Sequence, residues 1–302
     1  MHQTFKERRG LRGFLLDLAS GFGMGVAFII PGFSGGSVAV ILGIYERLIS
    51  AIANIFKDFW RSVKTLFPIF LGLAIGAVSL LFPLRLALEY FPLPTVSLFV
   101  GLAIGGIPTV TDKIEKKKSP TSLFALFIPL ALALSLSFLP VGAEVDLFGM
   151  NFGGYVLLFI IGVVGSSALV IPGISGSMLL LILGYYNPLI RVLTDNLLKG
   201  ENVLSSLLIL ATAGMGIIVG FIAVSVIMKL LLERCPRGTY LAIVGFIIGS
   251  LPTVFISTAK EAGMTTSTLP ASIPHWIACI ALLALGFALS FGIVKMAKKH
   301  SK

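Results

Sequence analysis

Charged side chains are scarce in this chain of 302 residues: Asp, Glu, Lys and Arg make up 12% of it, whereas apolar residues make up 57%. A soluble globular domain has roughly a quarter charged residues, because its surface must be covered with polar groups. The mean hydropathy of +1.03 is equally far from that balance. The composition therefore excludes a water-soluble particle and predicts a protein whose solvent is the lipid bilayer.

Cysteine and histidine are also nearly absent. Cys235 and Cys279 are too few for a disulfide framework and lack the spacing of a metal-binding motif. His2, His275 and His300 lie near the chain ends or near the ends of apolar segments, which argues against a histidine-based metal or phosphatase centre. We therefore expect neither a metal ion nor a cofactor.

Acidic residues are outnumbered, because 23 Lys and Arg face 13 Asp and Glu and leave a formal net charge of +10. In a soluble protein this excess would suggest a nucleic-acid partner. In a membrane protein it is expected from orientation, because Lys and Arg are retained in cytoplasmic loops. We therefore expect no nucleic acid to bind.

The apolar residues form stretches that are separated by short polar segments. These stretches cover residues 13–30, 34–52, 66–88, 94–110, 123–140, 153–171, 175–190, 203–232, 238–257 and 274–294. With both chain ends in the cytoplasm, the basic residues outside are only Arg85, Arg191, Lys199 and Lys260. This partition predicts a multi-pass membrane protein with cytoplasmic N- and C-termini.

The stretch that begins at Ser34 is too short to cross a membrane, since Glu46 and Arg47 interrupt it. Its uninterrupted part spans about 18 Å as a helix, against about 30 Å for the hydrocarbon core. Each of the two pairs of stretches that flank a Pro-Gly break is therefore expected to form a re-entrant hairpin of two half-helices. The other six stretches are expected to cross fully.

The chain contains an internal repeat. Residues 25–49 align without gaps to residues 166–190 at an offset of 141, and 12 of the 25 positions are identical. Further on, residues 101–110 match residues 245–254 at an offset of 144. Two collinear matches of this kind indicate a duplicated unit.

The repeat predicts the fold class. Each half would hold one re-entrant helix hairpin plus three transmembrane helices, and because three is odd the second copy is inverted. We expect an all-α polytopic membrane protein with two inverted-topology repeats, residues 1–145 and 146–302, in one membrane domain. This is the pattern of secondary transporters, which bind their substrate at the repeat interface.

Both copies of the repeat contain a Pro-Gly-x-Ser-Gly break. Proline ends one helix, glycine permits a tight turn and serine is a preferred N-cap for the next helix. A helix N-terminus offers free N–H groups and a positive dipole end to an anion. The two breaks are therefore expected to hold a phosphate between them, although simple tight turns stay an alternative. The residues concerned are Ser34, Gly35, Gly36, Ser37, Ser175, Gly176 and Ser177.

Further candidate substrate-binding residues lie close to these breaks or share a helix face by i,i+4 spacing. They are Tyr45, Glu46, Arg47, Tyr186 and the two pairs Arg85/Glu89 and Lys229/Glu233. Charges at membrane depth usually mark a pathway, but anchoring at the headgroup level is an equally open alternative. Asp17, in the first re-entrant segment, is a candidate group for coupling to a proton or a cation.

The string MGVAFIIPGFSGGSVAVILGIYERLI resembles the signature of the polyprenyl-phosphate transporter family (PopT-like proteins), formerly a domain family of unknown function. The strings IPGISGSMLLLILGYY and GSLPTV resemble the same family. The resemblance implies a transporter, not an enzyme, that recycles undecaprenyl phosphate from the outer to the cytoplasmic leaflet of the bacterial cytoplasmic membrane. Its partners would be the polyprenyl phosphate and the surrounding membrane lipids. Proton or sodium coupling and assembly into a homo-oligomer stay open.

Two other functions remain as alternatives. A membrane-embedded polyprenyl-pyrophosphate phosphatase would need a glutamate-rich EExxxE-type motif or active-site histidines, and neither accompanies the two breaks. A carrier for small soluble anions would use the same phosphate cradle. Access from the lipid side would distinguish the second alternative from a lipid transporter.

Overall fold

The computed structural model describes residues 10–29, 34–114, 121–136, 138–140, 142–197, 199–261 and 273–300. The regular elements of these ranges are all helices. Six of these helices are long and apolar enough to cross a membrane, and two bent helix pairs pass the same test. The prediction of an all-helical polytopic membrane protein is therefore confirmed for the described chain.

The helices occur in the same order in both halves of the chain. The first half contains α1 (Gly10–Ile29), α2 (Gly35–Ile41), α3 (Tyr45–Ala53), α4 (Phe59–Tyr90), α5 (Pro92–Thr111) and α6 (Thr121–Leu136). The second half contains α7 (Phe152–Val170), α8 (Gly176–Ile182), α9 (Tyr186–Arg191), the π-helix η1 (Val192–Leu197), α10 (Val203–Arg234), α11 (Pro236–Glu261) and α12 (Ile273–His300). The bounds of α4 and α10 differ by the repeat offset of 144 at both ends.

The expected hairpins of two half-helices need correction, because each break region contains a long helix and two short ones. The helices before the breaks, α1 and α7, have 20 and 19 residues, whereas α2 and α8 have seven each. A second bend then separates α2 from α3 by 120°, and α8 from the segment Tyr186–Leu197 (α9 and η1) by 108°. Gly43 and Gly184 allow this bend, because their φ angles of +68° and +78° are left-handed.

The set of crossing helices also differs from the expectation. The stretch 123–140 was expected to cross, yet α6 has only 16 residues, which span about 24 Å. By contrast α7, expected as a half-helix, is long and apolar enough to cross. Pro129 lies inside α6 and does not end it.

Four helix pairs pack closely through glycines at i,i+4 spacing. A Cβ added to any of these glycines would collide with the partner helix, mostly with its backbone, in the pairs α1–α4, α5–α12, α7–α10 and α6–α11. Small residues allow such contacts in membranes, where packing replaces the hydrophobic effect. The glycines are Gly72, Gly76, Gly101, Gly105, Gly216, Gly220, Gly245 and Gly249.

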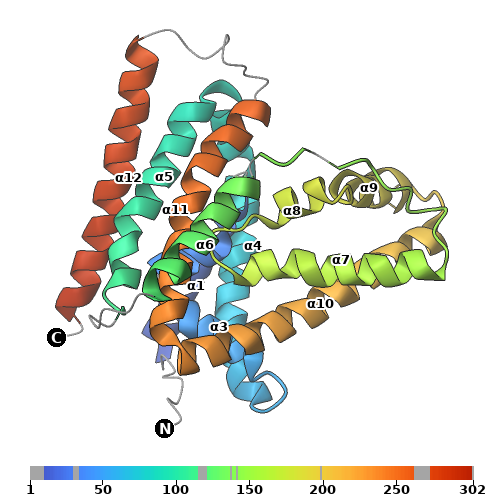
Figure 1. Ribbon diagram of the computed structural model, residues 1–302, viewed down its shortest axis with the longest axis horizontal. Helices are drawn as coiled ribbons and strands as arrows, with labels where there is room; N and C mark the ends of the chain where they lie inside the picture. The colour runs from blue at the N-terminus through green and yellow to red at the C-terminus, as the bar shows by residue number, and fades with distance from the viewer. Residues whose placement is uncertain are drawn as a thin grey trace.

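Two of these four pairs, α5–α12 and α6–α11, join the two halves. The last helix of each half packs against the next-to-last helix of the other half. Thus α12 lies along α5, and α6 lies along α11. Figure 1 shows α5 and α12 side by side in one part of the molecule and α7 and α10 side by side in another. The helices α5 and α11 also contact each other and join the two halves.

The two short hairpins differ in how they pack. The α2–α3 hairpin lies in the core, where α2 contacts α5 and α7 and α3 contacts α10. Five of the seven residues of α2 are buried, whereas none of α8 is. In the described chain no comparable contact joins α8 to α11 or η1 to α4. Similar sequences are thus held in unequal positions.

Candidate functional site

The first Ser-Gly segment, Ser34–Ser37, is buried where it opens α2. Ser34 has the extended backbone of an N-cap, φ −109° and ψ 129°. Its side chain is 5% exposed, and its Oγ atom has no hydrogen-bond partner in the described chain. An unpartnered buried hydroxyl costs free energy, so a native structure keeps one only for a reason.

The second Ser-Gly segment, Ser175–Ser177, is half-open and internally bonded. The backbone N–H of Met178 donates to Ser175 Oγ over 3.4 Å, which makes Ser175 a capping residue in side chain as well as backbone. The hydroxyls of Ser175 and Ser177 lie 3.1 Å apart. Both serines are thus N-caps as the sequence predicted, but only Ser175 caps with its side chain.

The first segment lies against the second break. A Cβ added to Gly36 would be 3.5 Å from the Leu169 carbonyl oxygen and 3.5 Å from Pro172 Cα. The described chain therefore brings the start of α2 to the end of α7, where the second Pro-Gly pair begins. Pro31 and Gly32, the first such pair, lie outside the described residues.

Tyr45 joins the first hairpin to the same helix end. Its phenol oxygen donates a hydrogen bond to the Val170 carbonyl oxygen over 2.9 Å, and this contact is buried. The acceptor is one of the last carbonyl groups of α7, which have no partner within the helix. Its repeat counterpart Tyr186 is half-buried and makes no side-chain hydrogen bond in the described chain.

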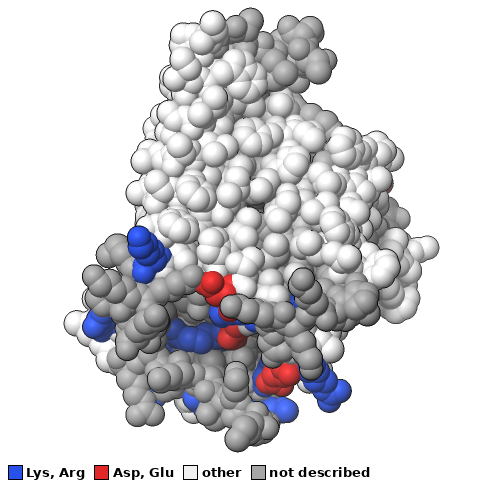
Figure 2. Space-filling view, turned by 60° about the vertical axis from the view of Figure 1, so that its left-hand side comes forward, with Lys and Arg blue, Asp and Glu red and all other residues white. Residues whose placement is uncertain are grey.

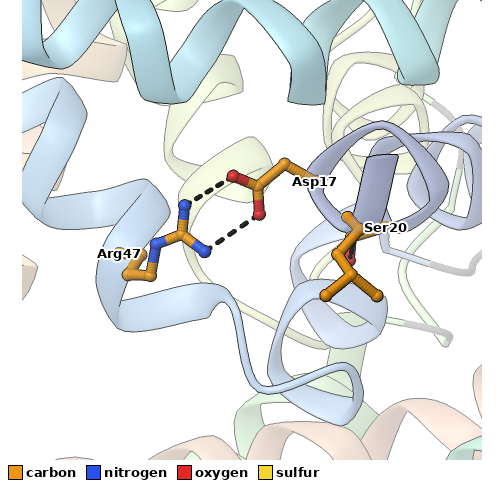
Figure 3. A network of polar contacts seen from close by, with 4 residues as sticks. Asp17, Ser20 and Arg47 are labelled. Carbon is orange, nitrogen blue, oxygen red and sulfur yellow. Dashed lines mark hydrogen bonds and ion pairs between the residues drawn. The ribbon is translucent and has the colours of Figure 1, made fainter. Parts of the chain in front are cut away.

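Arg47 and Asp17 form a buried ion pair between α3 and α1. The guanidinium donates from two nitrogens to both carboxylate oxygens, over 2.9 and 2.6 Å. The side chains are 14% and 4% exposed. Figure 3 shows the two groups facing each other, with Ser20 one turn along α1. Bidentate pairing of this kind is among the strong polar contacts of proteins.

Glu46 is held by one partner from the turn after α5 and one from α11. Its carboxylate accepts hydrogen bonds from Lys113 Nζ, over 2.6 Å, and from the phenol of Tyr240 on α11. The Lys113 ammonium also lies 5.6 Å from the centre of the Tyr240 ring. The cavity among these side chains measures about 10 Å³, which is room for a water molecule but not for a phosphate.

The two predicted i,i+4 pairs differ from each other. Lys229 Nζ lies 3.9 Å from the Glu233 carboxylate and also donates to Asn54 Oδ1 over 3.0 Å. Arg85 and Glu89 are both exposed, and no ion pair joins them in the described chain. The contact between Lys229 and Asn54 ties α10 to the end of α3.

Charged side chains gather at one end of the molecule. Figure 2 shows the described Lys, Arg, Asp and Glu side chains of this face near its lower end, while the rest of the face carries almost none. The uncharged part presents many exposed apolar side chains. This division is expected where one part of the surface contacts lipid and the other contacts water and headgroups.

The comparison with protein families decides what kind of chain this is. The undecaprenyl phosphate translocase-like (VCA0040-like) family matches residues 24–270. The chain belongs to this family. Membership confirms the family resemblance of the repeated motifs, and a family of translocases agrees with the expectation that the protein is not an enzyme.

Two curated relatives also match the chain. A polyprenyl-phosphate transporter of Staphylococcus aureus is 30% identical over 293 residues, which cover 94% of this chain and 98% of the relative. A polyprenyl-phosphate transporter of Vibrio cholerae is 30% identical over 119 residues, which cover 35% of this chain and 39% of the relative. No solved structure matches the chain.

Sequence reasoning missed several partners of the predicted residues in this translocase-like chain. It named Asp17 and Arg47 separately and did not pair them, and it did not single out Lys113 or Tyr240. Hydropathy does not reveal such partners, because they lie up to 194 residues away in the sequence. The only local signal was that Glu46 and Arg47 interrupt an apolar stretch.

Proposed function

We propose that this chain transports polyprenyl phosphate across the bacterial cytoplasmic membrane and returns the lipid carrier to the inner leaflet. Family membership and the relative that covers nearly the whole chain support this function. Because this family is described as translocase-like, we favour transport over the phosphatase alternative. The proposed orientation, with both termini in the cytoplasm, rests on the partition of basic residues.

The proposed binding site for the phosphate lies between the segments Ser34–Ser37 and Ser175–Ser177. The observation that carries it is the approach of Gly36 to Leu169 and Pro172, since this approach brings the two repeated breaks together. The buried, unpartnered hydroxyl of Ser34 supplies a donor there. The apolar tail would stay in the bilayer, next to the exposed apolar side chains.

The proposed transport cycle uses the two repeats, residues 1–145 and 146–302, in inverted topology. Movement of one inverted repeat against the other would expose one site alternately to opposite sides of the membrane. The unequal packing of the two hairpins supports this mechanism, because the first contacts α7 and α10 of the other repeat, whereas the second packs on α7 and α10 of its own repeat.

The charged candidates receive a role in the same cycle. Asp17, Glu46 and Arg47 hold the first hairpin in place through their ion pairs. Protonation of the Asp17 carboxylate would remove its charge and weaken its bond to Arg47. We therefore keep Asp17 as the candidate group that couples a proton to the release of this hairpin.

Reconstitution tests the proposed function directly. Purified protein in liposomes is given a polyprenyl phosphate, and its exposure on each leaflet is followed together with the release of free phosphate. Transport predicts a faster exchange between leaflets with no phosphate release. Release of free phosphate would instead support the phosphatase, and uptake of inorganic phosphate without lipid exchange would support the small-anion carrier.

Variants of the two serines test the proposed site. The double variant Ser34→Ala/Ser175→Ala removes both hydroxyls without adding bulk, and Ser34→Leu/Ser175→Leu also fills the space between the breaks. We expect the leucine variant to exchange lipid at least about tenfold more slowly, because it displaces hydrogen bonds to a charged group. Ser135→Leu, on the exposed face of α6, is the matched control. Equal exchange rates in all variants would refute the site.

A further inference from the structure

The two hairpins of the repeat occupy different positions. The repeat-related basic residues of α4 and α10 differ in the same way, because only the one on α10 bonds to a hairpin. Lys229 on α10 binds Asn54 at the end of the docked first hairpin. Its repeat counterpart on α4 is Arg85, at the offset of 144 that also relates the helix bounds. Arg85 is exposed and makes no hydrogen bond or ion pair in the described chain.

The repeat also supplies a counterpart for Asn54. Continued past Ile190, the offset of 141 places Asp195 of η1 opposite Asn54. The same alignment pairs Ala51 with Val192, and both of these side chains are 1% exposed. Asp195 at present bonds to Lys199 alone among the described residues, over 3.1 Å, and both side chains are more than half exposed.

Arg85 and Asp195 meet two requirements for a contact with each other. Their charges are opposite, whereas the contact formed by their counterparts joins an ammonium to a neutral amide. The partition of basic residues also places both on the outer side, because Asp195 lies between Arg191 and Lys199. By the same partition Lys229 and Asn54 lie on the inner side.

We propose that the protein has a second conformation in which the α8–η1 hairpin docks and Arg85 forms an ion pair with Asp195. The inference rests on the proposed function and extends it. In the described conformation Lys229 joins α10 to Asn54 of the first hairpin on the inner side, and no comparable contact joins α4 to η1 among the described residues. In the second conformation Arg85 and Asp195 close the outer side, and the first hairpin is released.

A second contact follows the same rule. Tyr45 donates to the Val170 carbonyl in the docked first hairpin. The counterparts at the offset of 141 are Tyr186 and Ile29, the last residue of α1. In the second conformation the phenol of Tyr186, which has no such bond here, donates to the Ile29 carbonyl. Each hairpin thus docks at the end of the long helix that opens the other repeat.

Two cysteine pairs test the proposal by cross-linking. In the background Cys235→Ser/Cys279→Ser, one variant carries Arg85→Cys/Asp195→Cys and another carries Asn54→Cys/Lys229→Cys. Both are reconstituted in liposomes that contain polyprenyl phosphate and are then oxidised. We expect both pairs to cross-link, and each cross-link to stop lipid exchange until it is reduced. Cross-linking of the inner pair without the outer pair would overturn the proposal.

Charge exchange provides an independent measurement. We expect Arg85→Asp to slow lipid exchange by about fivefold or more and Arg85→Asp/Asp195→Arg to restore it, since the pair carries the coupling between conformations. Glu201→Gln, which changes an exposed charge of the same loop without an ion pair in the described chain, is the control and should leave exchange unchanged. Failure of the double variant to recover would overturn the ion pair and would assign Arg85 to another role.

The same experiments separate this inference from the proposed function. If both cysteine pairs cross-link but no polyprenyl phosphate crosses the bilayer, the substrate is wrong and the second conformation stands. If lipid is transported while the outer pair never cross-links and the exchanged charges do not restore the rate, the function stands and the second conformation is wrong.

Discussion

Arg47 of α3 binds both carboxylate oxygens of Asp17 of α1, and this pair joins two helices whose residues lie 30 positions apart in the sequence. It is the most buried ion pair of the described chain, with side chains 14% and 4% exposed. Burial makes such a pair sensitive to the loss of either member, because desolvation has removed the water that would otherwise stabilise the charge. The pair therefore holds the first hairpin against the long helix that precedes it.

Removal of the guanidinium should destabilise the protein. We expect Arg47→Gln to lower the free energy of unfolding by about 3 to 5 kcal/mol, because Asp17 loses two charge-assisted hydrogen bonds in a buried place. Thermal unfolding of the protein in detergent measures this effect. Arg85→Gln changes an exposed, unpaired arginine and should stay within about 0.5 kcal/mol. Equal effects of both variants would contradict the structural role of the ion pair.

The two repeat-related tyrosines should respond differently to loss of their hydroxyls. Tyr45→Phe leaves the Val170 carbonyl without its donor, and we expect a loss of about 1 to 3 kcal/mol of stability. Tyr186→Phe removes no hydrogen bond of the described conformation and should leave the melting temperature unchanged. A comparison of the two melting temperatures, at equal expression and purity, checks this difference.

Two glycines of α10 provide a matched test of helix packing. A Cβ at Gly216 would collide with the Phe159 carbonyl of α7, whereas a Cβ at Gly214 would meet nothing within 4 Å. We expect Gly216→Ala to destabilise the protein by at least about 1 to 3 kcal/mol, because overpacking forces the helices apart. Gly214→Ala should be neutral or stabilising by up to about 1 kcal/mol. Thermal unfolding separates the two outcomes.

Acid should weaken one contact of the second hairpin. Hydrogen bonds from Arg191 and Asn187 hold the pKa of Glu144 below its ordinary value. The contact therefore contributes stability above the pKa of an unfolded glutamate, about 4.3, and loses it as pH falls through the lower folded value. We expect the difference in melting temperature between the parent and Glu144→Gln to shrink towards zero as pH falls below 4.3. A constant difference across that range would contradict this contact.

Much of the fold follows from local patterns in the sequence. The apolar stretches, the two breaks and the N-cap positions of Ser34 and Ser175 all depend on residues within a few turns of each other. The i,i+4 spacing of the close-packing glycines is also a local pattern, because it places them on one helix face and indicates close helix packing. The second bend at Gly43 was missed, since a single glycine in an apolar run does not by itself predict a break.

The sequence by itself determined that this is a duplicated membrane protein with two helix breaks, because hydropathy and repetition are properties of neighbouring residues. Tertiary structure alone decided which polar groups meet, since Arg47 finds Asp17 and Glu46 finds Tyr240 only after distant helices pack. It also decided that the first hairpin packs against the other repeat and the second against its own. The first hairpin carries Glu46 and Arg47, whose partners come from distant helices, whereas the second carries Asn187 and Pro188 at the same repeat positions. The position of each hairpin is therefore set by contacts that form only when the whole molecule packs.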